Sequence, residues 1–126
     1  MKNNKRPNKL VLVIEDDHAS LQYLLLLLKK LDYSAIVGKT GEEGLALMED
    51  KVVDVMLLDI ALGPGISGLE LGAILKKNKR HADTPMIAVS AFLKEKCQDL
   101  KSSGFVDYLS KPYTITDLQT ILGKHL

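Results

Sequence analysis

Disulfides, a large net charge and long apolar runs are all missing from this chain. Its 126 residues include one cysteine, Cys97, so no disulfide can form within the chain and a reducing compartment is expected. The formal net charge is only +1, with acids and bases interspersed, which gives no indication of nucleic-acid binding. The apolar block Leu24–Leu28 is far shorter than the roughly 20 residues that span a bilayer.

Targeting and linker segments are missing as well. The basic start leads only into the short run Leu10–Ile14, which acids follow, so no signal peptide is visible. Nothing of low complexity divides the sequence. We therefore expect a cytoplasmic protein without nucleic-acid or membrane partners, with a polar arm over residues 1–9 and one domain over residues 10–126.

What the chain does contain is a regular alternation of two kinds of segment. Short apolar runs without polar alternation are typical of buried parallel strands, and they are Leu10–Ile14, Ala35–Val37, Val52–Leu58, Met86–Val89 and Phe105–Leu109. Segments with helical periodicity lie between and after them: about His18–Leu31, a segment after Thr40, about Gly68–Lys79, about Lys94–Ser102 and a segment after Thr114. This repetition predicts an α/β fold, a doubly wound parallel sheet of five strands with helices on both faces.

Capping signals support several of these boundaries. Asp17 is placed to cap the first helix. Thr40, with Glu43 three residues on, matches the capping-box pattern for the second. Asp54 leaves open whether the third strand begins only there.

Chemically active residues follow four of the predicted strands. Because parallel strands end at one edge of the sheet, these residues are expected to lie together. They are Glu15, Asp16 and Asp17 after the first strand, Asp59 after the third, Ser90 after the fourth, and Ser110 and Lys111 after the fifth. Carboxylates that converge repel one another unless some hold protons or a cation lies among them. A site made only of oxygen ligands suits Mg²⁺, which is often bound by protein carboxylates and a phosphate together.

These groups predict a phosphoryl-transfer site. Lys111 supplies a positive charge for a phosphate oxygen, and Ser90 supplies a hydroxyl donor. Asp59 is the expected nucleophile, because aspartate is known to form covalent acyl-phosphate intermediates.

Four stretches of the chain resemble the receiver domains of two-component response regulators, the CheY-like superfamily. They are Leu-Val-Leu-Val-Ile-Glu-Asp-Asp at 10–17, Val-Met-Leu-Leu-Asp at 55–59, Thr-Pro-Met-Ile-Ala-Val-Ser-Ala at 84–91 and Asp-Tyr-Leu-Ser-Lys-Pro at 107–112. They come in the family's order and span essentially the whole chain from Leu10. The resemblance implies a flavodoxin-like sheet of strand order 2-1-3-4-5.

The resemblance also implies a role for each residue of the site. Asp59 is the phosphoacceptor, and Mg²⁺, or Mn²⁺ in its place, is held by Glu15, Asp16, Asp59 and the backbone carbonyl of Ala61. Ser90 is the switch hydroxyl, Lys111 forms an ion pair with the phosphoryl group, and Tyr108 is the switch aromatic that turns inward. The Lys111–Pro112 peptide bond is expected to be cis.

Two details depart from the family pattern or leave a choice. The loop after Asp59 is one residue longer than the commonest pattern, which makes the Ala61 assignment less direct. Three acids in a row also leave the register open. We assign Glu15 and Asp16 to the metal because they directly follow the apolar run, and leave Asp17 as the helix cap.

Partners follow from the same resemblance. The phosphoryl donor is a histidine kinase or a histidine phosphotransfer protein, and exposed leucines of the first helix are a hypothetical docking surface for it. The downstream target reads the face built from the fourth helix, fifth strand and fifth helix. A stand-alone regulator, a phosphorelay intermediate and a receiver excised from a hybrid kinase all remain open. Such a domain assists its own phosphorylation but is not an enzyme.

Three other functions would fit part of this sequence pattern. A phosphatase of the haloacid-dehalogenase type needs a second acid two residues after the nucleophile, where this chain has Ala61. A flavodoxin-like cofactor binder needs a phosphate-binding loop after the first strand, and three acids there would repel a phosphate. A phosphorylation-independent interaction domain is disfavoured by the intact set of acids, hydroxyl and lysine.

Overall fold

Strands and helices alternate along the whole described chain. The computed structural model describes residues 9–91 and 97–126. The elements are β1 (Leu10–Ile14), α1 (His18–Lys30), β2 (Ser34–Gly38), α2 (Gly41–Leu47), β3 (Val55–Asp59), α3 (Gly68–Lys77), β4 (Met86–Ser90), α4 (Cys97–Ser102), β5 (Asp107–Ser110) and α5 (Ile115–His125). The strands form one parallel sheet of order β2-β1-β3-β4-β5. The predicted fold class and strand order are confirmed.

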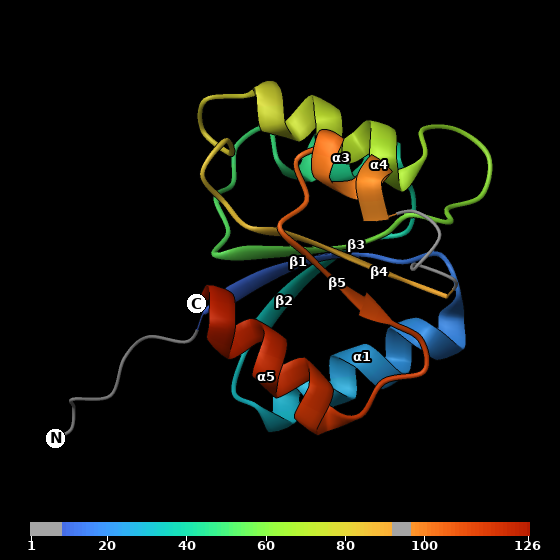
Figure 1. Ribbon diagram of the computed structural model, residues 1–126, viewed down its shortest axis with the longest axis vertical. Coiled ribbons are helices and arrows are strands. Elements are labelled where there is room, and N and C mark those ends of the chain that lie inside the picture. Colours follow the sequence, from blue (N-terminus) through green and yellow to red (C-terminus); the bar gives the residue numbers. More distant parts are fainter. Residues whose placement is uncertain (1–8, 92–96) are drawn as a thin grey trace, which may run out of the picture.

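Helices cover both faces of the sheet, and each face has its own apolar core. Figure 1 shows α1 and α5 on one face and α3 and α4 on the other. Successive side chains of a strand point to opposite faces, so β1, β3 and β4 each contribute to both cores. The α1–α5 side buries Val11, Val13, Val55, Leu57, Ile87 and Val89, and the opposite side buries Leu12, Ile14, Met56, Leu58, Met86 and Ala88. The unbroken apolar runs of the sequence are what such a sheet requires.

The first two helices begin at the predicted N-cap residues. Asp17 accepts a hydrogen bond from the Ser20 amide at 2.8 Å, as expected for the cap of α1. Thr40 caps α2 by accepting from the Glu43 amide, but the predicted capping box is incomplete. The Glu43 carboxylate instead accepts from the Lys39 amide, at 2.8 Å.

Complete capping boxes begin the third and fifth helices. Ser67 and Glu70 exchange hydrogen bonds at the start of α3, and Thr114 and Asp117 do so at the start of α5. Both place a carboxylate in the first turn, where the helix dipole favours negative charge.

One strand boundary that the sequence leaves open is resolved, and another predicted boundary is wrong. β3 begins at Val55, directly after Asp54, which agrees with the later of the two starts considered. β5 begins at Asp107 rather than at Phe105, although Phe105 is buried. Its ring packs beside α3 where Gly72 has no side chain, so Phe105 is buried by this contact although it precedes the strand. The predicted start of the fourth helix, Lys94, lies outside the described residues.

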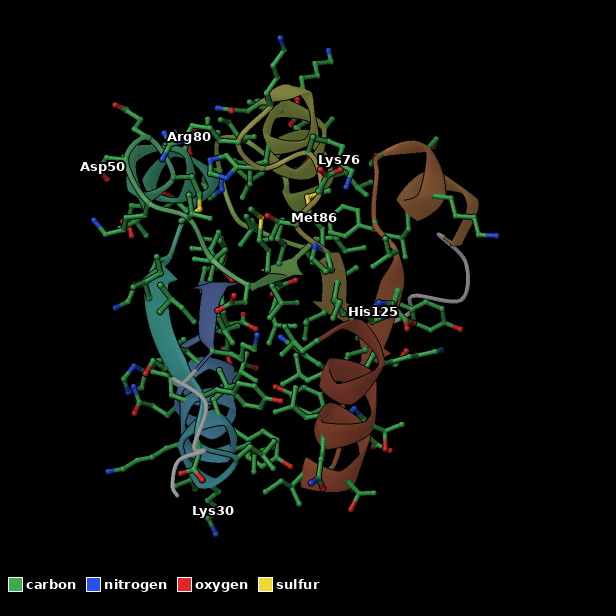
Figure 2. All side chains as sticks on the ribbon, turned by 90° about the vertical axis from the view of Figure 1, so that its left-hand side faces the viewer. Lys30, Asp50, Lys76, Arg80, Met86 and His125 are labelled. Atoms are coloured by element: carbon green, nitrogen blue, oxygen red, sulfur yellow. The ribbon has the colours of Figure 1, made fainter. Side chains whose placement is uncertain are left out.

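The segment between α3 and β4 is hydrogen-bonded to the segment at the C-terminal end of α2. The Arg80 guanidinium donates to the carbonyl oxygens of Glu49 and Lys51. The His81 ring is fully buried, with Nε2 2.8 Å from the Met48 carbonyl oxygen. Figure 2 looks at this end, with Arg80 near Asp50 and with Met86 in the interior. These bonds satisfy carbonyl groups of the C-cap of α2 and of the segment that follows it.

No helix within the described ranges is both long and apolar enough to cross a membrane. The expected polar arm falls on residues 1–8, outside the described part of the chain, and on Lys9. The Lys9 carbonyl accepts from the Ser34 amide at 2.9 Å, so ordered pairing between β1 and β2 extends back to this residue.

Candidate functional site

The carboxyl ends of β1, β3, β4 and β5 bring the predicted site residues to one edge of the sheet. Figure 1 shows this edge on the right, where the loop after β3 extends beyond the strands. Glu15 directly follows β1, Asp59 ends β3, Ser90 ends β4 and Lys111 directly follows β5. Glu15, Asp59 and Ser90 are buried to within a few per cent. The sheet therefore gathers two buried carboxylates, a hydroxyl and an ammonium group.

Three carboxylates lie close enough to share one cation. One oxygen from each of Glu15, Asp16 and Asp59 lies within 4.8 Å of the others. Asp16 is exposed, whereas Glu15 and Asp59 are buried. Their spacing, their all-oxygen chemistry and their excess of negative charge fit a hard divalent ion.

Lys111 is the cation that faces these acids. Its Nζ lies 2.6 Å from Glu15 Oε1 and 3.5 Å from Asp59 Oδ2. It also donates to the Ser20 hydroxyl oxygen at 3.3 Å. Partial burial alone would lower the pKa of Lys111, but the Glu15 and Asp59 carboxylates outweigh burial and raise the pKa overall. The lysine stays charged, and one positive charge leaves three carboxylates incompletely neutralised.

Asp17 has a separate task from its two neighbours. Its carboxylate is exposed and caps α1, while its amide donates to Glu15 Oε2 at 3.1 Å. The amide thus orients the Glu15 side chain. Hydrogen bonds from Ser20 lower the pKa of Asp17, so the cap remains charged under mild acid. The assignment of Asp17 as a helix cap is confirmed.

The loop between β3 and α3 folds back onto the acids. The Ala61 amide donates to Asp59 Oδ1 at 2.8 Å, and the Gly63 amide donates to Asp16 Oδ2 at 2.9 Å. Ala61 itself is exposed at this edge. The same residue therefore holds the Asp59 carboxylate through its amide and carries the carbonyl that was predicted as a metal ligand.

The predicted switch residues lie along β4 and β5. Ser90 pairs with Ser110 in the β4–β5 ladder, and its carbonyl oxygen accepts from the Lys111 amide at 2.9 Å. The Lys111–Pro112 peptide bond is cis, as predicted. The Tyr108 side chain is 39% exposed, so the ring points outward.

Sequence reasoning missed several groups that touch the site. The Ser20 hydroxyl, in the first turn of α1, accepts a hydrogen bond from Lys111, and the Gly63 amide donates one to Asp16. Beside Lys111, Tyr23 donates its hydroxyl to the Tyr113 carbonyl at 2.6 Å and so joins α1 to the β5–α5 loop. This junction borders a surface hollow of about 520 Å³, lined by Ala19, Ser20, Tyr23, Ala91, Lys111, Pro112 and Tyr113.

Glu15 has the most strongly perturbed acidity of the site. Burial raises its pKa to about 7, and the neighbouring Asp59 adds to the effect, against the opposing bonds from Lys111 and the Asp17 amide. Between its ordinary value of 4.5 and about 7, Glu15 is protonated in the folded protein and ionised in the unfolded chain. The folded state therefore binds more protons over this range, and its stability falls as the pH rises.

This imbalance predicts a pH-dependent stability that one substitution removes. Without divalent metal, the free energy of unfolding should fall by up to about 3 kcal/mol as the pH rises through this range. Glu15→Gln, which imitates the protonated form, should lose that decline. Urea unfolding at a series of pH values, with EDTA present, measures both proteins. Parallel profiles for wild type and variant would show that Glu15 is not the group responsible.

Comparison with known proteins identifies relatives along nearly the whole chain. Residues 11–123 match the model of the response regulator receiver domain family. The polar-differentiation response regulator DivK of Brucella ovis is 32% identical over 108 residues, which cover 85% of this chain and 87% of that protein.

Solved structures give the same answer for the fold. A CheY-like response regulator receiver domain from Methylobacillus flagellatus has a TM-score of 0.85 at 27% identity, covering 95% of this chain and 100% of that one. The receiver domain of a sensor histidine kinase from Pseudomonas aeruginosa, solved with magnesium in its active-site cleft, has a TM-score of 0.87. At 23% identity it covers 94% of this chain and 98% of its own, and the likeness concerns the fold alone.

Proposed function

The chain belongs to the response regulator receiver domain family, and from this membership we propose that Asp59 accepts a phosphoryl group from a phosphohistidine in a reaction that needs Mg²⁺. One observation carries the proposal. Asp59 ends β3 inside a group that also holds Glu15, Asp16 and Lys111, all within reach of one phosphoryl group. The chain is a receiver of two-component signalling, and the residues that perform the reaction are the proposal.

The metal site is proposed from the acids and the loop. Glu15, Asp16 and Asp59 would each give one carboxylate oxygen, and the Ala61 carbonyl would give a fourth protein ligand. A related receiver domain, from the Pseudomonas aeruginosa kinase, holds magnesium in its active-site cleft. Bound Mg²⁺ would supply the positive charge that offsets the charge of the phosphoryl oxygens during transfer.

In phosphoryl transfer the protein mainly positions the reacting groups and stabilises the negative charge of the phosphoryl oxygens. An Asp59 carboxylate oxygen attacks phosphorus in line with the P–N bond of the donor. The O–P bond forms as the P–N bond breaks, and the departing imidazole keeps the bonding pair and takes up a proton. The Ala61 amide holds Asp59 Oδ1, which fixes the direction of the carboxylate. Water later hydrolyses the acyl phosphate. The domain assists its own phosphorylation and acts as a phosphoacceptor rather than a conventional enzyme.

Phosphorylation would then change the contacts of two neighbouring groups. Lys111 now faces Glu15 and Asp59, and a phosphoryl group on Asp59 offers it further oxygens. Ser90, at the end of the adjacent strand, would donate its hydroxyl to the same group. Tyr108, now turned outward on β5, would move inward as Ser90 shifts. The phosphoryl group thus biases an equilibrium between two arrangements.

Two surfaces are proposed for partners. The kinase or phosphotransfer protein would approach over α1, where Tyr23 borders the hollow at Lys111 and Leu26 is exposed further along the helix. The downstream target would bind the α4–β5–α5 face, which carries Tyr108. These partners and the single cysteine favour a cytoplasmic location.

The first test of the proposal is the intact mass after incubation with a small phosphodonor. Wild type with acetyl phosphate and Mg²⁺ is expected to gain one phosphoryl group, because Asp59 lies among the metal ligands and Lys111. Asp59→Asn should gain none. Asp17→Asn is the matched control, since Asn caps a helix as well as Asp does and should leave the adduct unchanged.

The outcomes separate the proposal from its rivals. An adduct that forms without Mg²⁺, or that persists in Asp59→Asn, would remove Asp59 and its metal site from the reaction. A folded wild type with no adduct, under conditions where dephosphorylation is too slow to hide one, would favour a phosphorylation-independent interaction domain.

A further inference from the structure

In the loop between β3 and α3, residues 60–67, three backbone amides donate to carboxylates that precede the loop in the chain, and a fourth, that of Ser67, donates to Glu70 in the capping box of α3. The first three pairs are Ala61 N–H to Asp59 Oδ1 at 2.8 Å, Gly63 N–H to Asp16 Oδ2 at 2.9 Å, and Ile66 N–H to Glu42 Oε2 at 3.1 Å. The first two acceptors belong to the proposed metal site. The third belongs to α2 and lies outside that site.

This division matters once a metal binds. Asp16 and Asp59 would turn oxygen atoms toward Mg²⁺, whose octahedral coordination tolerates little deviation. The amides of Ala61 and Gly63 must then share these acceptors or release them. Glu42 has no such competing demand, so its bond to Ile66 can hold the loop in both the metal-free and the metal-bound protein.

The contact between α2 and the loop is close at every residue involved. A Cβ at Gly41 would lie 2.9 Å from both Cβ and the carbonyl oxygen of Ile66. Gly65 has φ +99°, and a Cβ there would lie 2.8 Å from each carboxylate oxygen of Glu42. The absence of side chains at Gly41 and Gly65 lets the loop backbone lie directly against the first turn of α2.

The loop also needs an anchor, because it contains glycines. Glycine backbone loses more conformational freedom on ordering than any other residue, and Gly63 and Gly65 both lie between Ala61 and α3. If only a fraction of molecules holds the Ala61 carbonyl in place, the apparent affinity for the metal falls by that fraction. A fixed point at Ile66 raises the fraction.

We propose that Glu42 is a positioning residue that anchors the β3–α3 loop independently of the metal and thereby sets the affinity of the site for Mg²⁺. The inference rests on the proposed metal site and adds a residue to it that binds neither metal nor phosphoryl group. Glu42 acts through Ile66 on the loop that carries Ala61.

Magnesium alone is the probe, and the neighbouring acid is the control. Glu42→Ala should raise the Mg²⁺ dissociation constant about three- to tenfold, the effect of losing one charge-assisted hydrogen bond. Glu43→Ala removes the same charge from the same helical turn, but the Glu43 carboxylate accepts from the Lys39 amide and, among the described residues, has no bond to the loop, so this variant should stay within about twofold of wild type. Glu42→Gln keeps an acceptor for the Ile66 amide and should also stay close to wild type. Calorimetric titration gives all four constants.

A second readout needs no metal. Backbone hydrogen exchange in EDTA should be faster at Ile66 in Glu42→Ala than in wild type, whereas Glu43→Ala should leave it unchanged. Circular dichroism of each variant confirms that it is folded before the titrations are compared.

Each contrary result overturns a different part of the argument. Equal losses of affinity in Glu42→Ala, Glu42→Gln and Glu43→Ala would show that charge at a distance, and not position, governs the metal. Faster exchange at Ile66 with unchanged affinity would show that the order of the loop does not matter to the site. A wild type that binds no Mg²⁺ would overturn the metal site itself, and the role of Glu42 with it.

Discussion

Replacement of Lys111 by methionine is expected to destabilise the metal-free protein by about 3 kcal/mol at a pH of about 8. At that pH Glu15 is ionised in the wild type, where its pKa is about 7 with the Lys111 hydrogen bond in place. Loss of that bond raises the pKa of Glu15 further, and the variant must either keep the charge unpaired or take up a proton. Lys111 Nζ lies 2.6 Å from Glu15 and 3.5 Å from Asp59, both of which are buried. Methionine preserves the length of the side chain but leaves these two carboxylates facing each other without a cation.

The cause of the loss can be identified by reversing it. At a pH of about 5.5, Glu15 holds a proton in the variant and most of the penalty should disappear. Millimolar Mg²⁺ should also restore stability at the higher pH, because it replaces the missing positive charge. Urea unfolding under these three conditions measures the effect. A deficit that neither acid nor Mg²⁺ reduces would mean that the packing of the lysine stem matters more than its charge.

A second lysine provides the control for Lys111. Lys124 pairs with Asp107 at 3.6 Å, but its side chain is 67% exposed. Exposed pairs contribute less than about 1 kcal/mol, so Lys124→Met should change stability little under every condition. The comparison separates the burial of the ion pair from its mere presence.

The sequence predicts the central strands well because burial on both faces leaves a plain apolar signal. β1 has the predicted bounds, Leu10–Ile14, and β4 extends one residue past the predicted Val89. β5 shows where the signal fails. Phe105 belongs to the same apolar run, but its burial comes from the space that Gly72 leaves on α3, a tertiary contact that no local pattern contains.

The site divides in the same way. Glu15, Asp59 and Lys111 could be placed together because parallel strands end at one edge, and their positions follow from strand order alone. Ser20, Glu42 and the Gly63 amide could not. Ser20 and the Gly63 amide contact site residues, and Glu42 contacts the loop beside the site. These contacts depend on the local path of a loop or the rotation of a helix, which apolar periodicity does not determine. His81 is a similar case, since its polar flanks give no sign that the ring is fully buried.

Gly68→Ala is expected to be among the most damaging small substitutions in the chain, because α3 begins against the backbone of Asp59 and Ile60. A Cβ at Gly68 would lie 2.2 Å from the Asp59 carbonyl oxygen and 2.5 Å from the Ile60 Cα atom. Both are backbone atoms, which cannot turn away as the end of a side chain can. Either α3 or the end of β3 must move, at a cost of about 3 kcal/mol.

Replacement of Gly123 by alanine should raise the free energy of unfolding instead of lowering it. Gly123 lies within α5, and a Cβ there would meet nothing within 4 Å. Alanine at an open helical position should stabilise the protein by about 0.5–1 kcal/mol. Thermal and urea unfolding of the two variants against wild type therefore test the steric argument with one chemical change.

A shift of the backbone at Gly68 should also slow the phosphorylation of Asp59. Below its melting temperature, Gly68→Ala is expected to form the acetyl-phosphate adduct more slowly than Gly123→Ala, because movement of β3 shifts the Asp59 carboxylate from Glu15 and Asp16. A Gly68→Ala protein as stable as wild type would mean that α3 shifts without cost. A destabilised protein with a normal rate of phosphorylation would mean that α3 alone moves and that the end of β3, with Asp59, stays in place.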